Sequence, residues 1–304
     1  MCTCLLTLLT CLAFLRCVLP QNPCRVTTLG LRVDHATSTA TEEYHGFHTF
    51  LGMASIFAAP SQRSSVKRLR SSFCLLLLIL SGNIEFNPGP PRDNLTLCTL
   101  NIRSMLHPLH TAAVFDLVTS HSVDVMALSE TWIRTTTTHR ELCEATPPDF
   151  DLISQPRLTL QPDSIGGGLA FLVKNSLHYT QPACPCYTSF ECCSITLADT
   201  VSGKLSVFNV YRPPNSSKYS SPFSTFIKEF ESFLTYAATL PHRFLITGDF
   251  NIHVNDSADI CSQQFVTLIS SFGLSQVIDF PTHDAGNTLD LVILPSDSPF
   301  TIAV

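Results

Sequence analysis

The stretch from Phe244 to Asn251 reads Phe-Leu-Ile-Thr-Gly-Asp-Phe-Asn, and the prediction of the fold starts from it. Its first four residues form a short apolar run, which indicates a buried β-strand. An acid and an amide, Asp249 and Asn251, follow two residues apart where that strand ends. Oxygen-bearing side chains at the end of a strand suit a metal ion and a phosphate group. The stretch therefore predicts a sheet with a candidate site at its edge.

Two earlier stretches have the same design, an apolar run that ends in a polar group. They are Leu-Asn-Ile-Arg at residues 100–103 and Ser-Glu-Thr-Trp at residues 129–132, and Tyr-Arg-Pro-Pro at residues 211–214 lies between them and Gly248. One polar residue after a strand is usually a turn residue, whereas several in one chain favour a shared site. The polar strand-end residues are Asn101, Glu130, Asp249 and Asn251.

Hydrophobic periodicity predicts alternating strands and helices downstream of residue 91. Because the strands outnumber the helices, and the helices fall between strand pairs, we expect two sheets packed face to face with helices outside, an α/β or α+β sandwich. The phenylalanines at helical spacing around residues 223–236 are expected to pack in the core. Strands are expected over 95–100, 124–128, 169–173, 191–197, 205–211, 244–247 and 289–294, and helices over 114–120, 224–236 and 265–272.

The charge balance differs along the chain. The 304 residues are 45% hydrophobic and 14% charged, with a net charge of −6, so most of the chain can form a packed core. Residues 1–90 carry seven Lys/Arg and four Asp/Glu, a balance of +3, which leaves −9 for residues 91–304. An acidic body argues against strong non-specific binding to nucleic acid. A phosphodiester substrate stays possible if a divalent metal supplies positive charge.

The chain has thirteen cysteines, some of them clustered as Cys184-Pro185-Cys186 and Cys192-Cys193. A zinc site is one interpretation, but the spacing is too tight and no His pair lies near. Buried reduced thiols are the preferred interpretation, and they favour the cytoplasm or nucleus.

Residues 1–72 are expected to be a poorly ordered segment. Residues 1–20 are apolar with Arg16 as the only charge, which leaves a signal peptide as the alternative to a chance apolar start. Residues 73–90 join a Leu-rich run to Asn-Pro-Gly-Pro, where a helix must stop. This segment resembles 2A-like ribosome-skipping peptides, which act in the ribosome exit tunnel and leave the bond equivalent to Gly89–Pro90 unmade. Asn83 departs from the acid usual in that pattern.

The residue types at the strand ends suggest roles in phosphodiester hydrolysis. Glu130 and Asn101 offer hard oxygen ligands for Mg²⁺. Asp249 can orient or deprotonate a water, and Asn251 can donate a hydrogen bond to a phosphate oxygen. The remaining candidates are the Tyr211 hydroxyl, Arg212 as a phosphate contact, and the later pair His283 and Asp290.

These motifs, in this order, resemble the endonuclease/exonuclease/phosphatase superfamily, and within it the apurinic-like endonuclease domain of vertebrate non-LTR retrotransposons. The resemblance covers about residues 95–304 and implies a four-layer α/β sandwich related to DNase I. It also implies a DNA substrate and Mg²⁺, or Mn²⁺, held at Asn101 and Glu130. By the same resemblance, Tyr211, Asp249 and Asn251 bind phosphate and activate water, and Thr282 or His283 lies with Asp290 at the far wall of the site.

One departure from the family pattern concerns its last motif, Ser-Asp-His. In the family this motif lies some tens of residues after the Leu-Asp-Leu strand, whereas Ser296-Asp297-Ser298 has no His and comes too early, and the chain ends at Val304. We therefore expect residues 91–304 to be a C-terminally truncated domain with weak or no nuclease activity. The sequence indicates no stable protein partner. The alternatives are a phosphoinositide or sphingolipid phosphodiesterase of the same superfamily and a non-enzymatic product.

Overall fold

The computed structural model describes residues 27–33, 94–157, 166–200, 203–215, 217, 220–283, 285–298 and 300–303. The expected 2A-like segment at 73–90, the apolar start at 1–20 and most of the segment 1–72 lie outside the described residues. No helix among the described residues combines the length and the apolar character needed to cross a bilayer.

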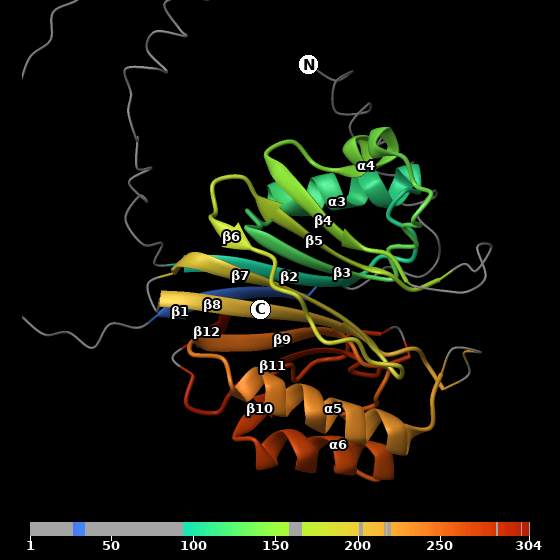
Figure 1. The fold of residues 1–304 in the computed structure, drawn as a ribbon, viewed down its shortest axis with the longest axis vertical. Helices are drawn as coiled ribbons and strands as arrows, with labels where there is room; N and C mark the ends of the chain where they lie inside the picture. The colour runs from blue at the N-terminus through green and yellow to red at the C-terminus, as the bar shows by residue number, and fades with distance from the viewer. Residues whose placement is uncertain are drawn as a thin grey trace, which may run out of the picture. The chain divides into compact units, whose positions relative to one another are not determined.

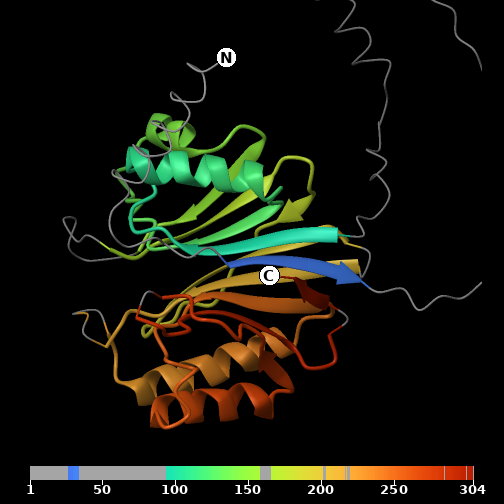
Figure 2. The same ribbon diagram turned by 180° about the vertical axis from the view of Figure 1, so that it is seen from behind.

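Two six-stranded mixed sheets form the centre of the fold (Figures 1 and 2). Each contains one parallel pair, β2–β3 in the first and β8–β9 in the second, and the other pairs are antiparallel. In spatial order, the first sheet is β12 (Phe300–Ala303), β1 (Thr27–Val33), β2 (Asn94–Asn101), β3 (Val125–Ser129), β5 (Leu169–Lys174) and β4 (Phe150–Gln155), and the second is β10 (Leu274–Gln276), β11 (Asp290–Pro295), β9 (Arg243–Asp249), β8 (Gly203–Tyr211), β7 (Glu191–Thr200) and β6 (Tyr179–Thr180).

Four helices among the described residues form the outer layers (Figure 1). Helices α3 (Pro108–Ser120) and α4 (His139–Ala145) cover the first sheet, and α5 (Phe223–Ala238) and α6 (Ile260–Ser271) cover the second. The arrangement is two mixed sheets between two helical layers, so the predicted four-layer sandwich is confirmed.

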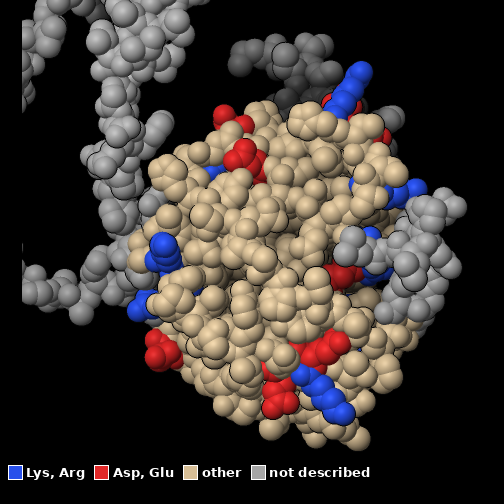
Figure 3. Space-filling view, viewed as in Figure 1, with Lys and Arg blue, Asp and Glu red and all other residues tan. Residues whose placement is uncertain are grey.

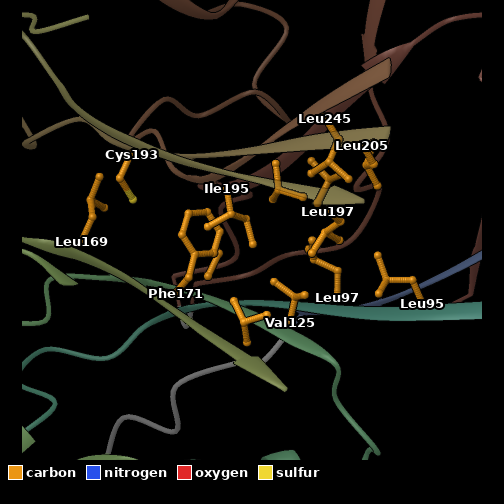
Figure 4. Close-up of a cluster of buried hydrophobic side chains, with 14 of the residues drawn as sticks. Leu95, Leu97, Val125, Leu169, Phe171, Cys193, Ile195, Leu197, Leu205 and Leu245 are labelled. Atoms are coloured by element: carbon orange, nitrogen blue, oxygen red, sulfur yellow. The ribbon is translucent and has the colours of Figure 1, made fainter. Parts of the chain in front are cut away.

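The inner core fills the space between the two sheets. Side chains of the first sheet, including Leu97, Val125 and Phe171, meet Ile195 and Leu205 from the second, and all five are at most 1% exposed (Figure 4). Alternate residues of each strand point into this layer because successive side chains of a strand face opposite sides of the sheet. This period-2 pattern makes the sheets stack with their apolar faces together.

A cluster of aromatic side chains fills the layer between the second sheet and its helices. Phe226, Phe230 and Phe233 of α5 are fully buried, and Phe230 lies 5.7 Å from the ring of Phe250 and 5.5 Å from that of Phe265. The spacing of three and four residues places these rings on one face of α5. The interpretation of these phenylalanines as core residues is therefore confirmed.

The structure contains elements that hydrophobic periodicity did not reveal: α4, β1, β4, β6, β10 and β12. β4 has a half-buried pattern and α4 has seven residues, so neither presents a long apolar period. Helix α3 starts at Pro108, six residues before the expected Val114, because proline suits the first helical position. β1 lies within the segment 1–72, for which little order was expected, so the sheet takes one strand from upstream of residue 91.

The cysteine cluster consists of free thiols in the structure. Cys192 and Cys193 are buried on β7, and the sulfur of Cys184 lies 3.1 Å from that of Cys192. Burial raises the pKa of both buried thiols well above its ordinary value. These two cysteines therefore pack as neutral side chains.

Charged side chains are scattered over the face shown in Figure 3, and most of that surface is neither acidic nor basic. This distribution agrees with the low charged content of the sequence, 14%. This face therefore presents no broad patch of a single charge.

Candidate active site

Strand ends from both sheets meet at one edge of the sandwich. Asn101 ends β2, Asp249 ends β9 and Tyr211 ends β8, while Glu130 directly follows β3. Asp290 opens β11, where it pairs with Asp249. The two parallel pairs explain the meeting, because parallel strands finish at the same edge of a sheet. The register confirms it, since Asn101 pairs with Ser129 and Tyr211 with Asp249.

Hydrogen bonds join these side chains across the two sheets. Nδ2 of Asn101 donates to Oε1 of Glu130 at 3.0 Å and to Oδ2 of Asp249 at 2.7 Å. The hydroxyl of Tyr211 donates to the same Oε1 of Glu130 at 3.1 Å. Four of the predicted site residues therefore form one connected cluster, and both Asn101 and Tyr211 link the two sheets.

The backbone around Glu130 is held in an unusual conformation. Glu130 has a φ of 53°, and its carbonyl accepts from the N–H of Ser104 at 2.9 Å. The next residue, Thr131, donates its N–H to the carbonyl of Gly168 at 3.1 Å. A Cβ on Gly168 would lie 2.8 Å from Oγ1 of Thr131. The glycine run at 166–168 thus lets a neighbouring chain segment approach closely and fix the Glu130 loop.

Asn251 is fixed on the other side of Asp249. Its backbone N–H donates to Oδ1 of Asp249 at 3.0 Å, and its side-chain Nδ2 donates to the carbonyl of Arg212 at 2.8 Å. Its φ of 49° turns the chain sharply after the strand. The Asp-Phe-Asn sequence therefore orients the carboxylate of Asp249 through a local turn as well as through Asn101.

Arg212 was expected to contact phosphate, and the structure places it differently. Its side chain is buried, and Nη1 donates to the carbonyls of Phe250 at 3.3 Å and Asn251 at 3.1 Å. Nη2 donates to Oδ1 of Asn215, and the guanidinium lies 5.2 Å from the ring centre of Phe226. Through these contacts, Arg212 holds the loop that carries Asn251 in place.

Thr282 and Asp290 form a second buried unit next to the cluster. Oγ1 of Thr282 accepts from the N–H groups of Leu289 at 2.9 Å and Asp290 at 3.0 Å. Oδ1 of Asp290 is buried and makes no hydrogen bond with any described residue. Thr282 therefore positions the start of β11, and Asp290 carries an unsatisfied acceptor beside Asp249.

His283 lies apart from this unit. Its side chain is exposed, and its Nδ1 accepts from the N–H of Ala285 at 3.1 Å inside its own loop. Its backbone N–H donates to Asn287 and its carbonyl accepts from Gly286. Among the described residues these local bonds, rather than contacts with the carboxylates, define the position of His283.

The acids of the site repel one another in a buried setting. Burial and the charge of Glu130 raise the pKa of Asp249, whereas bonds from Asn101 and Asn251 and the charge of Arg103 lower it, and the resulting pKa is about 6. Burial, and then the charge of Asp249, raise the pKa of Asp290 well above its ordinary value. Burial and the charges of Glu130 and Asp249 raise the pKa of Tyr211. The site therefore has an excess of negative charge that a cation would relieve.

The donor set suits a magnesium ion that keeps part of its water shell better than a metal ion held only by protein ligands. No three His, Cys, Asp or Glu side chains form a metal cage within the described part of the chain. Mg²⁺ does not require one, because it binds through one or two carboxylates and keeps several waters. Glu130 with the amide of Asn101, beside Asp249, offers such a set, and the raised acid pKa values give the cation a favourable electrostatic environment.

Sequence reasoning missed three residues near the cluster. Arg157 lies 5.5 Å from the ring centre of Tyr211 and pairs with Glu191, which also accepts from the N–H of Gly168 at 2.7 Å. Glu191 opens an apolar strand opposite Tyr211, so the same strand-end pattern could have identified it. Arg103 is exposed and directly follows Asn101-Ile102; its charge near Asp249 is visible only in three dimensions.

A model of the "Endonuclease/Exonuclease/phosphatase family" matches residues 98–299 of the chain. This range includes every residue of the cluster described above. No curated protein matches the chain significantly.

Several solved structures are similar to the chain at low identity. AP endonuclease LMAP from Leishmania major has a TM-score of 0.51 at 14% identity, with 65% of this chain and 78% of that chain covered. The endonuclease domain of TRAS1, a telomere-specific non-LTR retrotransposon, has a TM-score of 0.47 at 14% identity, with 66% of this chain and 84% of that chain covered. At 14% identity, the similarity to AP endonuclease LMAP shows a shared fold and no more.

Proposed function

The chain belongs to the endonuclease/exonuclease/phosphatase family, and from that premise we propose that it hydrolyses phosphodiester bonds in DNA with a divalent metal ion. The observation that carries the proposal is the cluster at the strand ends. There the amide of Asn101 joins Glu130 and Asp249, and the Tyr211 hydroxyl reaches Glu130. Such a group combines a metal-ligating carboxylate, a buried acid and neutral donors at one point.

The cofactor proposed is Mg²⁺, or Mn²⁺, held by Glu130 and Asn101. When bound, the ion would neutralise charge that builds on the phosphate oxygens. Its presence would also offset the repulsion between Glu130 and Asp249 that raises the pKa of Asp249.

Asp249 is proposed as the group that orients and deprotonates the attacking water. Its pKa of about 6 leaves it ionised at neutral pH yet close enough to that pH to accept a proton. The bonds from Asn101 and from the N–H of Asn251 hold the carboxylate in place while it does so.

Tyr211 and Asn251 are proposed as neutral donors to the phosphate. The raised pKa of Tyr211 keeps its hydroxyl protonated, so it can donate to an oxygen that gains negative charge. Asp290, ordered by Thr282, is proposed to form the far wall of the site. His283 remains a candidate from the motif alone, because its structural contacts lie within its own loop.

The finer proposal is a DNA-nicking endonuclease of a non-LTR retrotransposon. It is supported by the motifs Ser-Glu-Thr-Trp and Tyr-Arg-Pro-Pro around Glu130 and Tyr211. We expect slow turnover, because Oδ1 of Asp290 has no histidine partner within the described residues. Loss of one member of a coupled catalytic set often costs orders of magnitude in rate.

A plasmid-nicking assay tests the function. Supercoiled plasmid is incubated with the full chain and Mg²⁺ or Mn²⁺, and the nicked circle is quantified over long incubations. We expect slow nicking that stops with a chelator and falls on the order of a hundredfold in Glu130→Gln. Glu231→Gln, on the exposed side of α5, is the matched control and should keep the parent rate.

Other outcomes divide the alternatives. Metal-dependent release of phosphate from a phosphoinositide, without nicking, would replace DNA by a phosphomonoester substrate, and release of phosphocholine from sphingomyelin would replace it by another phosphodiester. Nicking at about 1 s⁻¹ or faster would refute the slow turnover. Nicking unchanged by Glu130→Gln would refute the assignment of the site.

A further inference from the structure

Strand β1 occupies an interior position in the first sheet although it lies far upstream in the sequence. It runs between β2 and β12, as the blue strand in Figure 2 shows, and residues 34–93 separate it from β2 along the chain. The interval includes Gly89–Pro90, the bond singled out by the 2A-like pattern. The sheet is therefore completed by a segment on the other side of a candidate break in the chain.

The pairing of β1 is extensive on both sides. With β2 it pairs antiparallel from Thr27↔Thr99 to Arg32↔Asn94. With β12 it pairs antiparallel from Gly30↔Ala303 to Val33↔Phe300. From residue 30 to residue 32 both neighbours are present, so each backbone N–H and C=O there faces a partner strand.

β1 also links two parts of the chain that are otherwise separate in this sheet. Within the described residues, β12 pairs with β1 alone. Removing β1 would leave β2 as a sheet edge with unpaired N–H and C=O groups, and an open edge of this kind readily takes up another strand. The facing edges of β2 and β12 thus form a binding position for one strand.

We propose that the edges of β2 and β12 hold residues 27–33 through backbone pairing, without a covalent link, so that the N-terminal segment stays bound after the chain is broken between residues 34 and 93. A break at Gly89–Pro90 would give two polypeptides, 1–89 and 90–304, that remain one complex. The occupant is a segment of this same chain, and the recognition is the addition of a strand to a sheet edge. No covalent step is involved.

The position of β1 also affects the candidate site, and this effect does not depend on the chemistry of the site. β2 carries Asn101 at its far end, and the β1–β2 register fixes β2 along its length from Asn94 to Thr99. A bound N-terminal segment therefore holds the strand that delivers the amide linking Glu130 and Asp249. This makes residues 27–33 a structural partner of the domain.

The test uses the full chain with a specific protease site inserted between Gly89 and Pro90. The folded protein is purified, cut and run on a size-exclusion column under native conditions. We expect both fragments to co-elute and to separate only in denaturant. Leu31→Pro removes one backbone donor in the doubly flanked part of β1 and should weaken retention of the N-terminal fragment on the order of tenfold or more. Leu31→Val keeps the donor and should co-elute like the parent.

Hydrogen exchange on the uncut protein gives a second readout, which applies even if the proline variant folds poorly. Amides of residues 94–99 that face β1 should be protected in the parent and in Leu31→Val, and should exchange at least about tenfold faster in Leu31→Pro. Separation of the fragments after cutting the parent, or co-elution that Leu31→Pro leaves unchanged, would overturn the proposal. Neither readout measures nuclease activity, so failure here is distinguishable from failure of the proposed function.

Discussion

Asp249 is a single side chain on which hydrogen bonding and burial act in opposite directions. Its carboxylate is buried and receives hydrogen bonds from Asn101 and from the N–H of Asn251, which favour the ionised form. Burial and the charge of Glu130 act in the opposite direction and win, so the pKa rises to about 6. A buried acid with a pKa near neutral pH destabilises the fold when it is ionised, so packing alone does not account for its presence.

This balance predicts a pH-dependent effect of Asp249→Asn on stability. The folded-state pKa lies above the unfolded value of about 3.9, so the stability contributed by the protonated acid is complete below pH 4 and is lost as pH rises through 6. The asparagine side chain of the variant carries no charge at any pH. We expect Asp249→Asn to be more stable than the parent by on the order of 1–3 kcal/mol at pH 7.5 and equally stable near pH 4, in urea melts with chelator present.

The matched control is Asp256→Asn, an exposed acid in the following loop, which should leave stability nearly unchanged at both pH values. A parent protein that gains stability between pH 4 and pH 7 relative to Asp249→Asn would contradict the raised pKa. The stabilised variant should also lose nicking, which separates the energetic role of the residue from its chemical one.

At the scale of the elements, the site residues lie together because the ends of their strands lie at one edge of the sandwich. The last residues of β9 show how closely β8 and β9 approach each other there. Gly248 has a φ of 129°, and a Cβ there would lie 2.0 Å from the carbonyl oxygen of Val210 on β8. The carbonyl belongs to the backbone, so the overlap cannot be relieved by a side-chain rotation. The glycine allows β8 and β9 to bring Tyr211 and Asp249 side by side.

We therefore predict that Gly248→Ala destabilises the protein by more than about 4 kcal/mol, through overlap and backbone strain. Gly273→Ala is the control, because Gly273 also has a positive φ, 69°, but a Cβ there meets nothing within 4 Å. That control should lose only about 1–2 kcal/mol from the left-handed conformation. Equal losses in thermal or urea unfolding would show that the close approach of the strands is unimportant.

Long, periodic elements were predictable from sequence, and short ones were not. β2, β5, β8 and α5 present a clear period of 2 or 3.6, so their positions were anticipated to within a few residues. α4 lacks that period, but the sequence carries a capping-box pattern there, Thr138 followed three residues later by Glu141. In the structure, the Thr138 side chain accepts from the N–H of Glu141, and the Glu141 side chain accepts from the N–H of Thr138. β1 and β12 have no such local signal, since their place in the sheet depends on partners far along the chain.

Across the whole molecule, the two sheets are joined by polar as well as apolar contacts. Asn209 is fully buried on β8 in the second sheet, and its Nδ2 donates to the carbonyls of Leu128 at 2.9 Å and Ala170 at 3.2 Å in the first. It lies two residues before Tyr211 and pairs with Thr247, two residues before Asp249. Asn209 therefore fixes the relative position of the sheets that Asn101 links at the edge.

We predict that Asn209→Ala lowers stability by about 2–4 kcal/mol, because it leaves buried carbonyls without their donor and opens a small cavity. Asn175→Ala, an exposed asparagine in the turn after β5, should change stability by less than about 0.5 kcal/mol. Urea unfolding at fixed pH measures both. A loss in Asn209→Ala no larger than that of the control would mean that apolar packing alone aligns the sheets.

Periodicity and residue type are local properties, so the amino-acid sequence was enough to predict the sandwich class, the strands that carry polar ends and the candidate residues of the site. It could not give the link from Asn101 to Asp249, the burial of Arg212 or the isolation of His283 within its loop. Nor could it show that Thr27–Val33 completes the sheet. Those features depend on which strands become neighbours. Because neighbours are chosen by the packing of the whole core, they became visible only in the folded chain.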